Sequence, residues 1–474
     1  MYASNCLLPY NGSMNHGSGQ KNFTSLPPNI IKPLDSENKK KNFLQILLEV
    51  DLFTHMFLLL FIIILVFLYV ANENNKAKLN RASLENHIAT NSAHIIAAPK
   101  LSNESLYINQ KVVFIDKKYF NIPEKFILTM NGPIKKEVFG YLPYWMIQNL
   151  DDIDTRTLTS VSYFGLEVNG DGQIVNRAQN DGFSPYDTWQ NDIKLKNFLT
   201  KIKKNKTKIF VTFKSFDNDA IKKIATSPES SQNFIQTILY QVNSHSLDGV
   251  NIDFEYSGGV DKEIRDKFSV LMSSLNDALK SQNQNTALTI SVYVTAATIP
   301  QLWDIPYIAN HSDSVVIMGY DFFTPQSSSA GPVAPISGYE NSLTGMINNF
   351  LEQIPPDKIT LAVPYYAYDW TTENQGKNSK AVLGVNASTL SFAEAKDMSQ
   401  GKNVIWDNDS QTPWYSYVDR VGQIHVVHFE NIRSLGAKYD LVNTKNLHGI
   451  GIWALGLEGN DTETTQLIID KFTH

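Results

Sequence analysis

Short apolar runs alternate with longer segments of helical periodicity from about residue 136 to the C-terminus. Short runs rich in β-branched and aromatic residues are typical of strands, and apolar residues every three or four positions are typical of helices. The pattern predicts eight strands, at 138–141, 160–166, 208–213, 249–254, 287–294, 314–319, 359–364 and 449–454, with helices between them, as at 230–244, 262–282 and 342–353. This alternation predicts an α/β fold, a (β/α)8 TIM barrel.

One interval in the alternation is longer than the others. Residues 369–428 contain further strand-like pieces, at 404–406, 414–418 and 424–427, and predict a small α+β insertion after the seventh strand. The alternative architecture is a doubly wound open sheet, which would carry a glycine-rich phosphate turn after its first strand. Residues 140–145 read GYLPYW, which is not such a turn, so the pattern favours the barrel.

A different hydrophobic pattern lies near the N-terminus. Residues 52–71, LFTHMFLLLFIIILVFLYVA, carry no formal charge. As a helix, a run of this length would cross the roughly 30 Å hydrocarbon core of a bilayer. We therefore expect one transmembrane helix in a single-pass membrane protein. A cleaved signal peptide is the alternative, but a long polar segment precedes the run and Tyr69 would occupy position −3 if cleavage followed Ala71.

The transmembrane prediction divides the chain into four parts. Residues 1–51, with pieces such as SLPPN and NGSMNHGSGQ, predict a disordered cytosolic tail. Residues 52–71 are the predicted membrane span, 72–134 a stalk or linker, and 135–474 the barrel. Basic residues flank the span on both sides, at 39–41 and at 76, 78 and 81, so the positive-inside rule does not orient it.

Composition narrows the classes of function. Hydrophobic residues make up 42% and charged residues 19% of the 474 residues, which fits a globular protein. A net charge of −6 gives no support for nucleic-acid binding. The single cysteine, Cys6, excludes an intramolecular disulfide and a multi-cysteine metal site. We expect no metal and no cofactor.

The predicted strand at 249–254 carries acidic residues in an otherwise apolar run, LDGVNIDFEY at 247–256. Strand side chains alternate, so Gly249, Asn251, Asp253 and Glu255 share one face, with neighbours roughly 6–7 Å apart, whereas Asp248 is out of phase. Buried carboxylates are unfavourable unless they are paired, hydrogen-bonded or protonated. A solvated edge strand is the alternative, but its wet face would favour Lys or Thr. The pattern therefore indicates a catalytic site.

The segment Asp248-Gly-Val-Asn-Ile-Asp-Phe-Glu255 resembles the D-G-x-D-x-D-x-E signature of glycoside hydrolase family 18, the chitinase-like enzymes. Two more motifs support the resemblance. Met318, Tyr320 and Asp321 match the family's M-x-Y-D, and Trp453 stands where the family has a Trp that floors the sugar pocket. The three motifs follow the family's order within residues 136–474.

The chain departs from the family pattern at two places. Asn251 replaces the middle Asp of the signature, and the third strand runs into KSFDN at 214–218 where the family usually has S-x-G-G. We expect Asn251 to donate a hydrogen bond to Asp253, which it holds as a fixed anion because an amide cannot titrate. Since Asp and Asn reach glycine conformations less easily, we also expect a different loop after the third strand.

The resemblance implies a retaining, substrate-assisted mechanism. It makes Glu255 the acid and base, assigns Asp253 to orient the substrate's 2-acetamido group, and assigns Tyr320 to donate a hydrogen bond to that group. Burial and the neighbouring carboxylate should raise the pKa of Glu255. The other implied substrate-binding residues are Asn251, Met318, Asp321, Trp453 and Tyr141. For Tyr141, Trp145, Tyr366 and Trp370, sugar stacking and core packing both remain open.

The sequence therefore predicts a glycosidase that cleaves β-1,4-linked polysaccharides containing N-acetylglucosamine, either chitin-like or peptidoglycan. Its expected partners are the polysaccharide or oligosaccharide and, through the single helix, a membrane, with no nucleic acid. Because the substrate is an extracellular glycan, we expect the catalytic domain outside the cytoplasm. One alternative is a weak or inactive lectin-like barrel that binds glycans, and another is a structural envelope protein. The presence of Glu255 favours the enzyme.

Overall fold

A computed structural model of the chain describes residues 132–178, 184–299 and 301–473. The predicted tail at 1–51, the predicted membrane span at 52–71 and nearly all of the predicted linker at 72–134 lie outside these residues. Every helix within the described ranges is too short or too polar to cross a bilayer.

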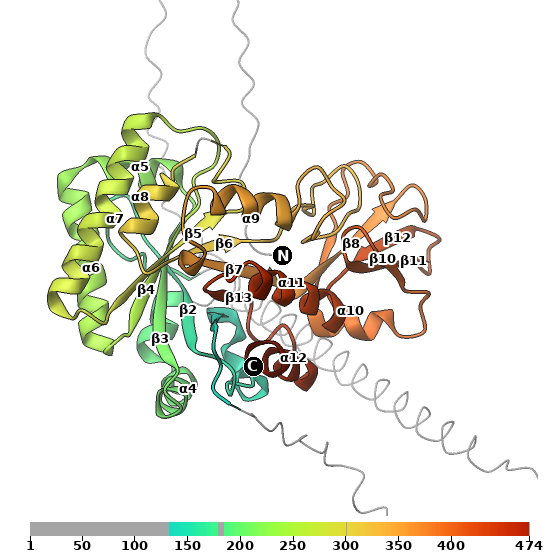
Figure 1. Cartoon of the computed structure of the whole chain (residues 1–474), viewed down its shortest axis with the longest axis horizontal. Coiled ribbons are helices and arrows are strands. Elements are labelled where there is room, and N and C mark those ends of the chain that lie inside the picture. Colours follow the sequence, from blue (N-terminus) through green and yellow to red (C-terminus); the bar gives the residue numbers. More distant parts are fainter. Residues whose placement is uncertain (1–131, 179–183, 300, 474) are drawn as a thin grey trace, which may run out of the picture. The chain divides into compact units, whose positions relative to one another are not determined.

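Eight parallel strands form a closed barrel, in the spatial order β1-β13-β7-β6-β5-β4-β3-β2 (Figure 1). The strands are β1 (Glu137–Pro143), β2 (Ser160–Glu167), β3 (Lys208–Ser215), β4 (Gly249–Phe254), β5 (Ala287–Tyr293), β6 (Ser314–Met318), β7 (Ile359–Pro364) and β13 (Gly449–Trp453). All eight correspond to the predicted strands. The closed barrel is confirmed, and the doubly wound open sheet is excluded.

Helices connect successive strands and cover the outside of the barrel (Figure 1). They are η2 (Tyr144–Asp152), α3 (Pro185–Asn191), α4 (Ile193–Lys204), α5 (Asn218–Thr226), α6 (Pro228–His245), α7 (Lys262–Gln282), α8 (Ile305–Asn310), α9 (Leu343–Leu351), η3 (Pro356–Lys358), α11 (Ile432–Thr444) and α12 (Thr462–Phe472). Several begin at a side chain that accepts from a free backbone N–H, such as Asp217 before α5 and Ser227 before α6. The predicted helix at 262–282 matches α7.

The alternation along β4 separates two apolar cores. Phe254 points outward and lies 5.4 Å from Phe234 of α6 and 6.1 Å from Phe268 of α7, measured between ring centroids. The opposite face points into the barrel, where Phe210 belongs to a separate aromatic cluster. Gly249 leaves room for that ring, because a Cβ there would lie 2.2 Å from a Phe210 ring carbon. At the N-terminal end of β4, the inside of the barrel is therefore filled by side chains such as Phe210.

The predicted insertion after the seventh barrel strand is a five-stranded antiparallel sheet with one helix, and it stands beside the barrel (Figure 1). Its strand order is β10-β11-β12-β8-β9. The elements are β8 (Tyr366–Thr372), β9 (Ser388–Ser391), α10 (Phe392–Ser399), β10 (Ile405–Asp407), β11 (Thr412–Val418) and β12 (Ile424–His428). The α+β insertion is confirmed, but it begins at Tyr366 and not at residue 369, because β8 follows β7 almost at once.

Candidate active site

The acidic residues of β4 lie at the C-terminal end of the barrel with the predicted alternation. Asp253 is only 4% exposed, whereas Glu255, just beyond the strand, is partly accessible. The Glu255 backbone N–H donates to the Ser215 carbonyl over 2.9 Å, which extends the parallel pairing past the end of the strand. Asp248 lies at the opposite end, where its carboxylate accepts from the Ile209 N–H. Asp248, which is out of phase with the ladder, thus caps the N-terminal end of the β3–β4 pairing and takes no part in the site.

The two carboxyl groups of the site have different proton affinities. Burial, followed by the Asp253 carboxylate, raises the pKa of Glu255 to about 8, against an opposing hydrogen bond with Tyr293. Burial raises the pKa of Asp253 only to about 6, because the Lys214 ammonium and Ser291 oppose it. Between these values Asp253 is ionised and Glu255 carries a proton. When the pKa values of two neighbouring carboxyl groups differ in this way, the group with the higher value can act as the acid and the other as the anion.

The environment of Asn251 differs from the expectation. Its Nδ2 donates to Thr289 Oγ1 over 2.9 Å, its Oδ1 accepts from Ser291 Oγ over 3.2 Å, and Ser291 also shares a hydrogen bond with the Tyr141 hydroxyl. No hydrogen bond joins Asn251 to Asp253 in the described structure. The reason is geometric: residues two apart on a strand are farther from each other than residues paired across neighbouring strands. Thr289 is the β5 residue paired with Asn251.

Asn251 is also fully buried. Both ends of its amide are held by β5, so Asn251 supports the floor of the site, and its expected contact with a sugar stays a prediction. Tyr141 is 3% exposed, and its hydroxyl belongs to the same network. Asn251 and Tyr141 therefore belong to one hydrogen-bond network with Ser291, which lies beneath Asp253.

An aromatic cluster closes the barrel beside the carboxylates. The partly exposed Trp453 ring lies 4.6 Å from the Phe164 ring and 5.6 Å from the Tyr141 ring, edge to face in both cases. Phe164 also contacts the partly buried Trp145 edge-on, at 6.3 Å. These contacts hold the accessible Trp453 indole at the barrel mouth, where it can stack on the apolar face of a sugar.

The M-x-Y-D residues lie where the barrel meets the insertion. Met318 ends β6, and both Met318 and Tyr320 are partly exposed. Asp321 is exposed, with φ of 60°, and its Oδ1 accepts hydrogen bonds from the hydroxyls of Tyr366 and Tyr368, the latter over 2.8 Å. Both tyrosines belong to β8. These bonds attach the insertion to the loop that follows β6.

Sugar stacking and core packing were both open for Tyr366 and Trp370, and the two residues differ. Trp370 is fully buried, and Trp370, Tyr366 and Tyr368 pack in one cluster of the insertion. Tyr366 combines this packing with its bond to Asp321. For Trp370 the structure supports core packing, and Tyr366 supports the site through Asp321.

The loop after β3 forms without glycine. All residues at 214–218 are described, and none of them has a positive φ. The Asp217 carboxylate accepts from the N–H groups of Asp219 and Ala220 at the start of α5, so the chain passes directly from strand to helix. Asn218 exchanges two hydrogen bonds of 2.9 Å with the Ser257 backbone, which ties this loop to the one after Glu255. Phe216 is left 41% exposed.

Sequence reasoning missed two residues that face the carboxylates, Lys214 and Tyr293. Lys214 shares the inward phase of Phe210 and Thr212 on β3 and pairs in register with Asp253. Tyr293 is the last residue of β5, and its hydrogen bond is one of the influences on the pKa of Glu255. The sequence could have identified Lys214 by its inward-facing position on β3 and Tyr293 by its position at the C-terminal end of β5.

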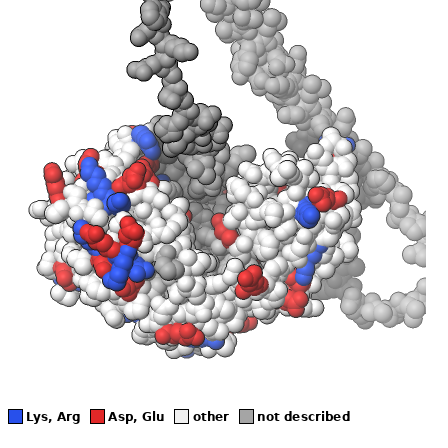
Figure 2. Space-filling model, turned by 90° about the horizontal axis from the view of Figure 1, so that it is seen from above, with Lys and Arg blue, Asp and Glu red and all other residues white. Residues whose placement is uncertain are grey.

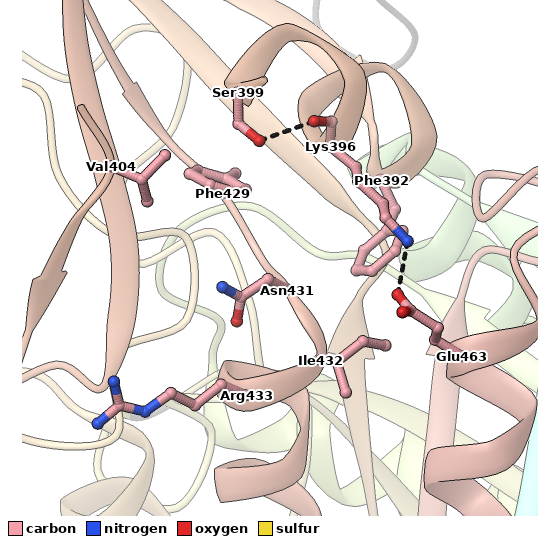
Figure 3. A pocket seen from close by; sticks show the side chains of 9 residues that line it. All are labelled: Phe392, Lys396, Ser399, Val404, Phe429, Asn431, Ile432, Arg433 and Glu463. Carbon is pink, nitrogen blue, oxygen red and sulfur yellow. Dashed lines mark hydrogen bonds and ion pairs between the residues drawn. The ribbon is translucent and has the colours of Figure 1, made fainter. Parts of the chain in front are cut away.

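Figure 2 shows a hollow between the barrel lobe and the insertion lobe, with acidic side chains in it and mostly uncharged surface around it. Charged side chains gather instead on the barrel lobe away from the hollow. A separate cavity of about 330 Å³ is drawn in Figure 3. It is lined by Phe392, Lys396, Ser399, Val404, Phe429, Asn431, Ile432, Arg433 and Glu463, and it contains none of the residues of the acidic strand.

The polar groups of this second cavity are largely engaged. Lys396 Nζ pairs with Glu463 over 2.6 Å and with Asp461 over 2.7 Å, and Asn431 caps α11. Arg433 stacks on the Trp406 ring, 3.8 Å from its centroid. We therefore assign the chemistry to the barrel mouth. Within the described residues there is no group of three or more His, Cys, Asp or Glu side chains arranged to hold a metal ion.

Comparisons with known proteins agree with this geometry. A putative sporulation-specific glycosylase of Bacillus subtilis (strain 168) is 28% identical over 335 residues, which cover 68% of this chain and 73% of the relative. The di-N-acetylchitobiase of Homo sapiens is 24% identical over 249 residues, covering 50% of this chain and 64% of the relative. The structure of the Ostrinia furnacalis Group IV chitinase shares the fold, with a TM-score of 0.61 and 23% identity over 71% of this chain and 100% of the chitinase chain. Residues 137–458 match the family model of glycosyl hydrolases family 18, which covers more than half of the chain. The chain belongs to glycosyl hydrolases family 18.

Proposed function

We propose that the protein is a retaining glycosidase that cleaves β-1,4-linked polysaccharides containing N-acetylglucosamine, with Glu255 as acid and base. The observation that carries the proposal is the pair of carboxyl groups at the C-terminal end of β4, Asp253 within the strand and Glu255 just after it. The pKa of Glu255 is raised to about 8 and that of Asp253 to about 6. A glycosidase acid must hold its proton at the working pH until the leaving oxygen takes it.

The position of Asp253 favours substrate assistance. A two-carboxylate retaining enzyme places its nucleophile across the sugar from the acid, with the carboxyl groups about 5–5.5 Å apart. Asp253 instead shares a strand face with Glu255. Asp321, whose charge also raises the pKa of Glu255, accepts hydrogen bonds from two tyrosines. The nucleophile in this account is therefore the substrate's own 2-acetamido oxygen.

Each remaining residue of the site has a role in this account. Asp253 orients the acetamido N–H and stabilises the oxazolinium cation that forms when its oxygen attacks the anomeric carbon. One oxygen of Asp253, Oδ1, is buried with no hydrogen-bond partner in the described structure, which fits a group reserved for the substrate. Tyr320 donates a hydrogen bond to the acetamido oxygen. Trp453 stacks under the reacting sugar, and Met318 and Asp321 line the same subsite.

After the first step Glu255 is ionised. It then removes a proton from the water that opens the oxazolinium ring, and the product keeps the β configuration. The same carboxyl group thus acts once as acid and once as base. Neither step requires a metal ion in this account.

The substrate class is supported by chemistry and by the relatives' names. One relative is named a di-N-acetylchitobiase and another a putative sporulation-specific glycosylase. Uncharged surface around the hollow suits a chain of neutral sugars (Figure 2). We propose chitin-like chains or peptidoglycan as the substrate.

The direct test is to incubate the full-length protein with chitin oligosaccharides, with peptidoglycan and with an N-glycosylated protein, and to identify products by mass spectrometry. We expect new reducing ends at N-acetylglucosamine in one of the first two substrates and none with Glu255→Gln. Binding of these glycans without any cleavage would replace the enzyme with a lectin-like protein.

We further propose that residues 52–71 anchor the protein in a membrane with the barrel outside the cell and the tail inside. The proposal rests on the uncharged apolar run and on the location of the substrate. Protease added to intact cells should then degrade the barrel and spare the tail that contains Cys6. A barrel that is digested only after lysis would reverse the orientation, and a mature N-terminus near residue 72 would indicate a cleaved signal.

A further inference from the structure

Lys214 points into the barrel from β3, directly beside the acidic strand. It pairs in register with Asp253 on one side and with Glu167 of β2 on the other. Its aliphatic stem lies over Gly165, where a Cβ would come within 3.1 Å of Lys214 Cδ. The missing side chain at Gly165 therefore leaves the space in which the lysine reaches across the barrel mouth.

Lys214 is partly buried, and three acidic residues lie close enough to act on its charge. Burial lowers the pKa of Lys214, whereas Glu167, Asp253 and Glu255, in that order, favour its charged form, and Arg177 has a smaller opposing effect. Glu167 is already paired with Arg177 over 2.7 Å. Lys214 makes no ion pair within 4.0 Å in the described part of the chain. Its Nζ lies 4.5 Å from the centroid of the Phe216 ring, which covers the charge.

The two catalytic carboxyl groups depend on Lys214 to different degrees. After burial, Lys214 is the largest influence on the pKa of Asp253 and lowers it. For Glu255 it is the last of five influences, after burial, Asp253, Tyr293 and Asp321. Tyr141, Tyr293 and Tyr320 also lie at the mouth, and burial raises their pKa values so that they stay neutral. Burial also raises the pKa of Asp321, and the charge of Asp321 acts on Glu255 in the same direction as that of Asp253. Lys214 is thus the one cation among the described residues that acts on both carboxyl groups.

We propose that Lys214 is a positioning residue whose charge keeps Asp253 ionised while Glu255 retains its proton. It does so through the packing of its stem on Gly165 and its register beside Asp253. The inference rests on the proposed function. Asn251 cannot share a proton with Asp253, so a cation on the neighbouring strand supplies the bias toward the anion. A nearby positive charge favours the ionised form of a carboxyl group.

The direction in which the pH–rate profile moves without the Lys214 charge follows from the roles of Asp253 and Glu255. Removing the cation raises both pKa values, and that of Asp253 more. Turnover needs Asp253 ionised, so the acid limb of the pH–rate profile moves to higher pH. It also needs Glu255 protonated, so the alkaline limb moves the same way but less. The active pH range therefore narrows from its acid side.

The test compares kcat/KM against pH for three variants of the full-length protein. Lys214→Met keeps the length of the side chain and removes the charge, and Lys214→Arg keeps the charge. Lys208→Met is the matched control, because Lys208 is an exposed residue at the start of the same strand. Thermal melting checks that each variant is folded.

We expect Lys214→Met to move the acid limb upward by about 1 pH unit, which lowers kcat/KM by about tenfold at pH values below that limb. Lys214→Arg and Lys208→Met should keep the wild-type limbs. A Lys214→Met profile that is lower but not displaced would overturn the inference and leave a structural role. An equal displacement in Lys214→Arg would also overturn it. A wild-type protein with no turnover would instead overturn the proposed function on which the inference rests.

Discussion

Asp253 of β4 lies two positions before Glu255, which follows directly after the strand, and the charge of Asp253 helps to raise the pKa of Glu255 to about 8. The two carboxyl groups titrate as a coupled pair, in which the Asp253 charge favours the proton on Glu255. Their order of ionisation is set by their surroundings. Lys214 and Ser291 favour the Asp253 anion, whereas burial and Asp253 itself favour protonated Glu255.

The first prediction follows from the proton on Glu255. Glu255→Gln keeps the size of the side chain but cannot transfer a proton to the leaving oxygen. General acid catalysis is worth about 10²–10⁴-fold, so we expect kcat to fall by at least that order on a chitin oligosaccharide, with substrate affinity retained. Turnover comparable to wild type in a folded variant would remove Glu255 from its role.

The second prediction concerns the dependence of rate on pH. Asp253 must be ionised and Glu255 protonated, so kcat/KM should rise with pH through about 6 and fall through about 8. In Glu255→Gln the alkaline fall should be absent from any residual activity. Initial rates on a soluble oligosaccharide from pH 4 to about 10 would measure both limbs. A single limb in the wild-type protein would contradict the paired roles.

The third prediction concerns Asn251, which β5 holds through Thr289 and Ser291. Asn251→Asp places a second carboxyl group in a fully buried position beneath Asp253. A like charge raises a neighbouring carboxyl pKa, so the acid limb should move to higher pH with less change in the maximum rate. Asn251→Ser is the uncharged control. A profile that superimposes on that of wild type would show that position 251 is not electrostatically coupled to the site.

The fourth prediction concerns stability at a distance from the site. Lys438 of α11 and Glu430 form an ion pair of 2.8 Å in which both side chains are inaccessible to solvent. Lys438→Met leaves the Glu430 carboxylate buried without its partner, and we expect a loss of about 3–5 kcal/mol in the free energy of unfolding. Denaturant titration measures this loss. The double variant with Glu430→Leu should recover most of it, and a double variant no more stable than the single one would contradict this explanation.

The sequence alone predicted the barrel, the insertion and the inward phase of the acidic strand, because these follow from local periodicity. It did not predict the partners of that strand. Asn251 bonds to β5 and not to Asp253, and Lys214 lies beside Asp253, because barrel closure fixes the register between strands. The bond from Tyr368 to Asp321 joins residues 47 positions apart and depends on how the insertion folds back. No local pattern in the sequence carries such relationships.

The most direct test of the central claim uses one pair of substrates. A chitin oligosaccharide and its de-N-acetylated counterpart differ only in the acetamido group that acts as nucleophile in this account. With the full-length protein, rates on both and the anomeric configuration of the fresh product are measured by proton NMR. We predict β products from the acetylated chain and a loss of kcat, not of affinity alone, on the deacetylated chain, because the missing interaction is made in the transition state. Inverted α products, or equal turnover of the two chains, would contradict substrate assistance at Asp253 and Tyr320.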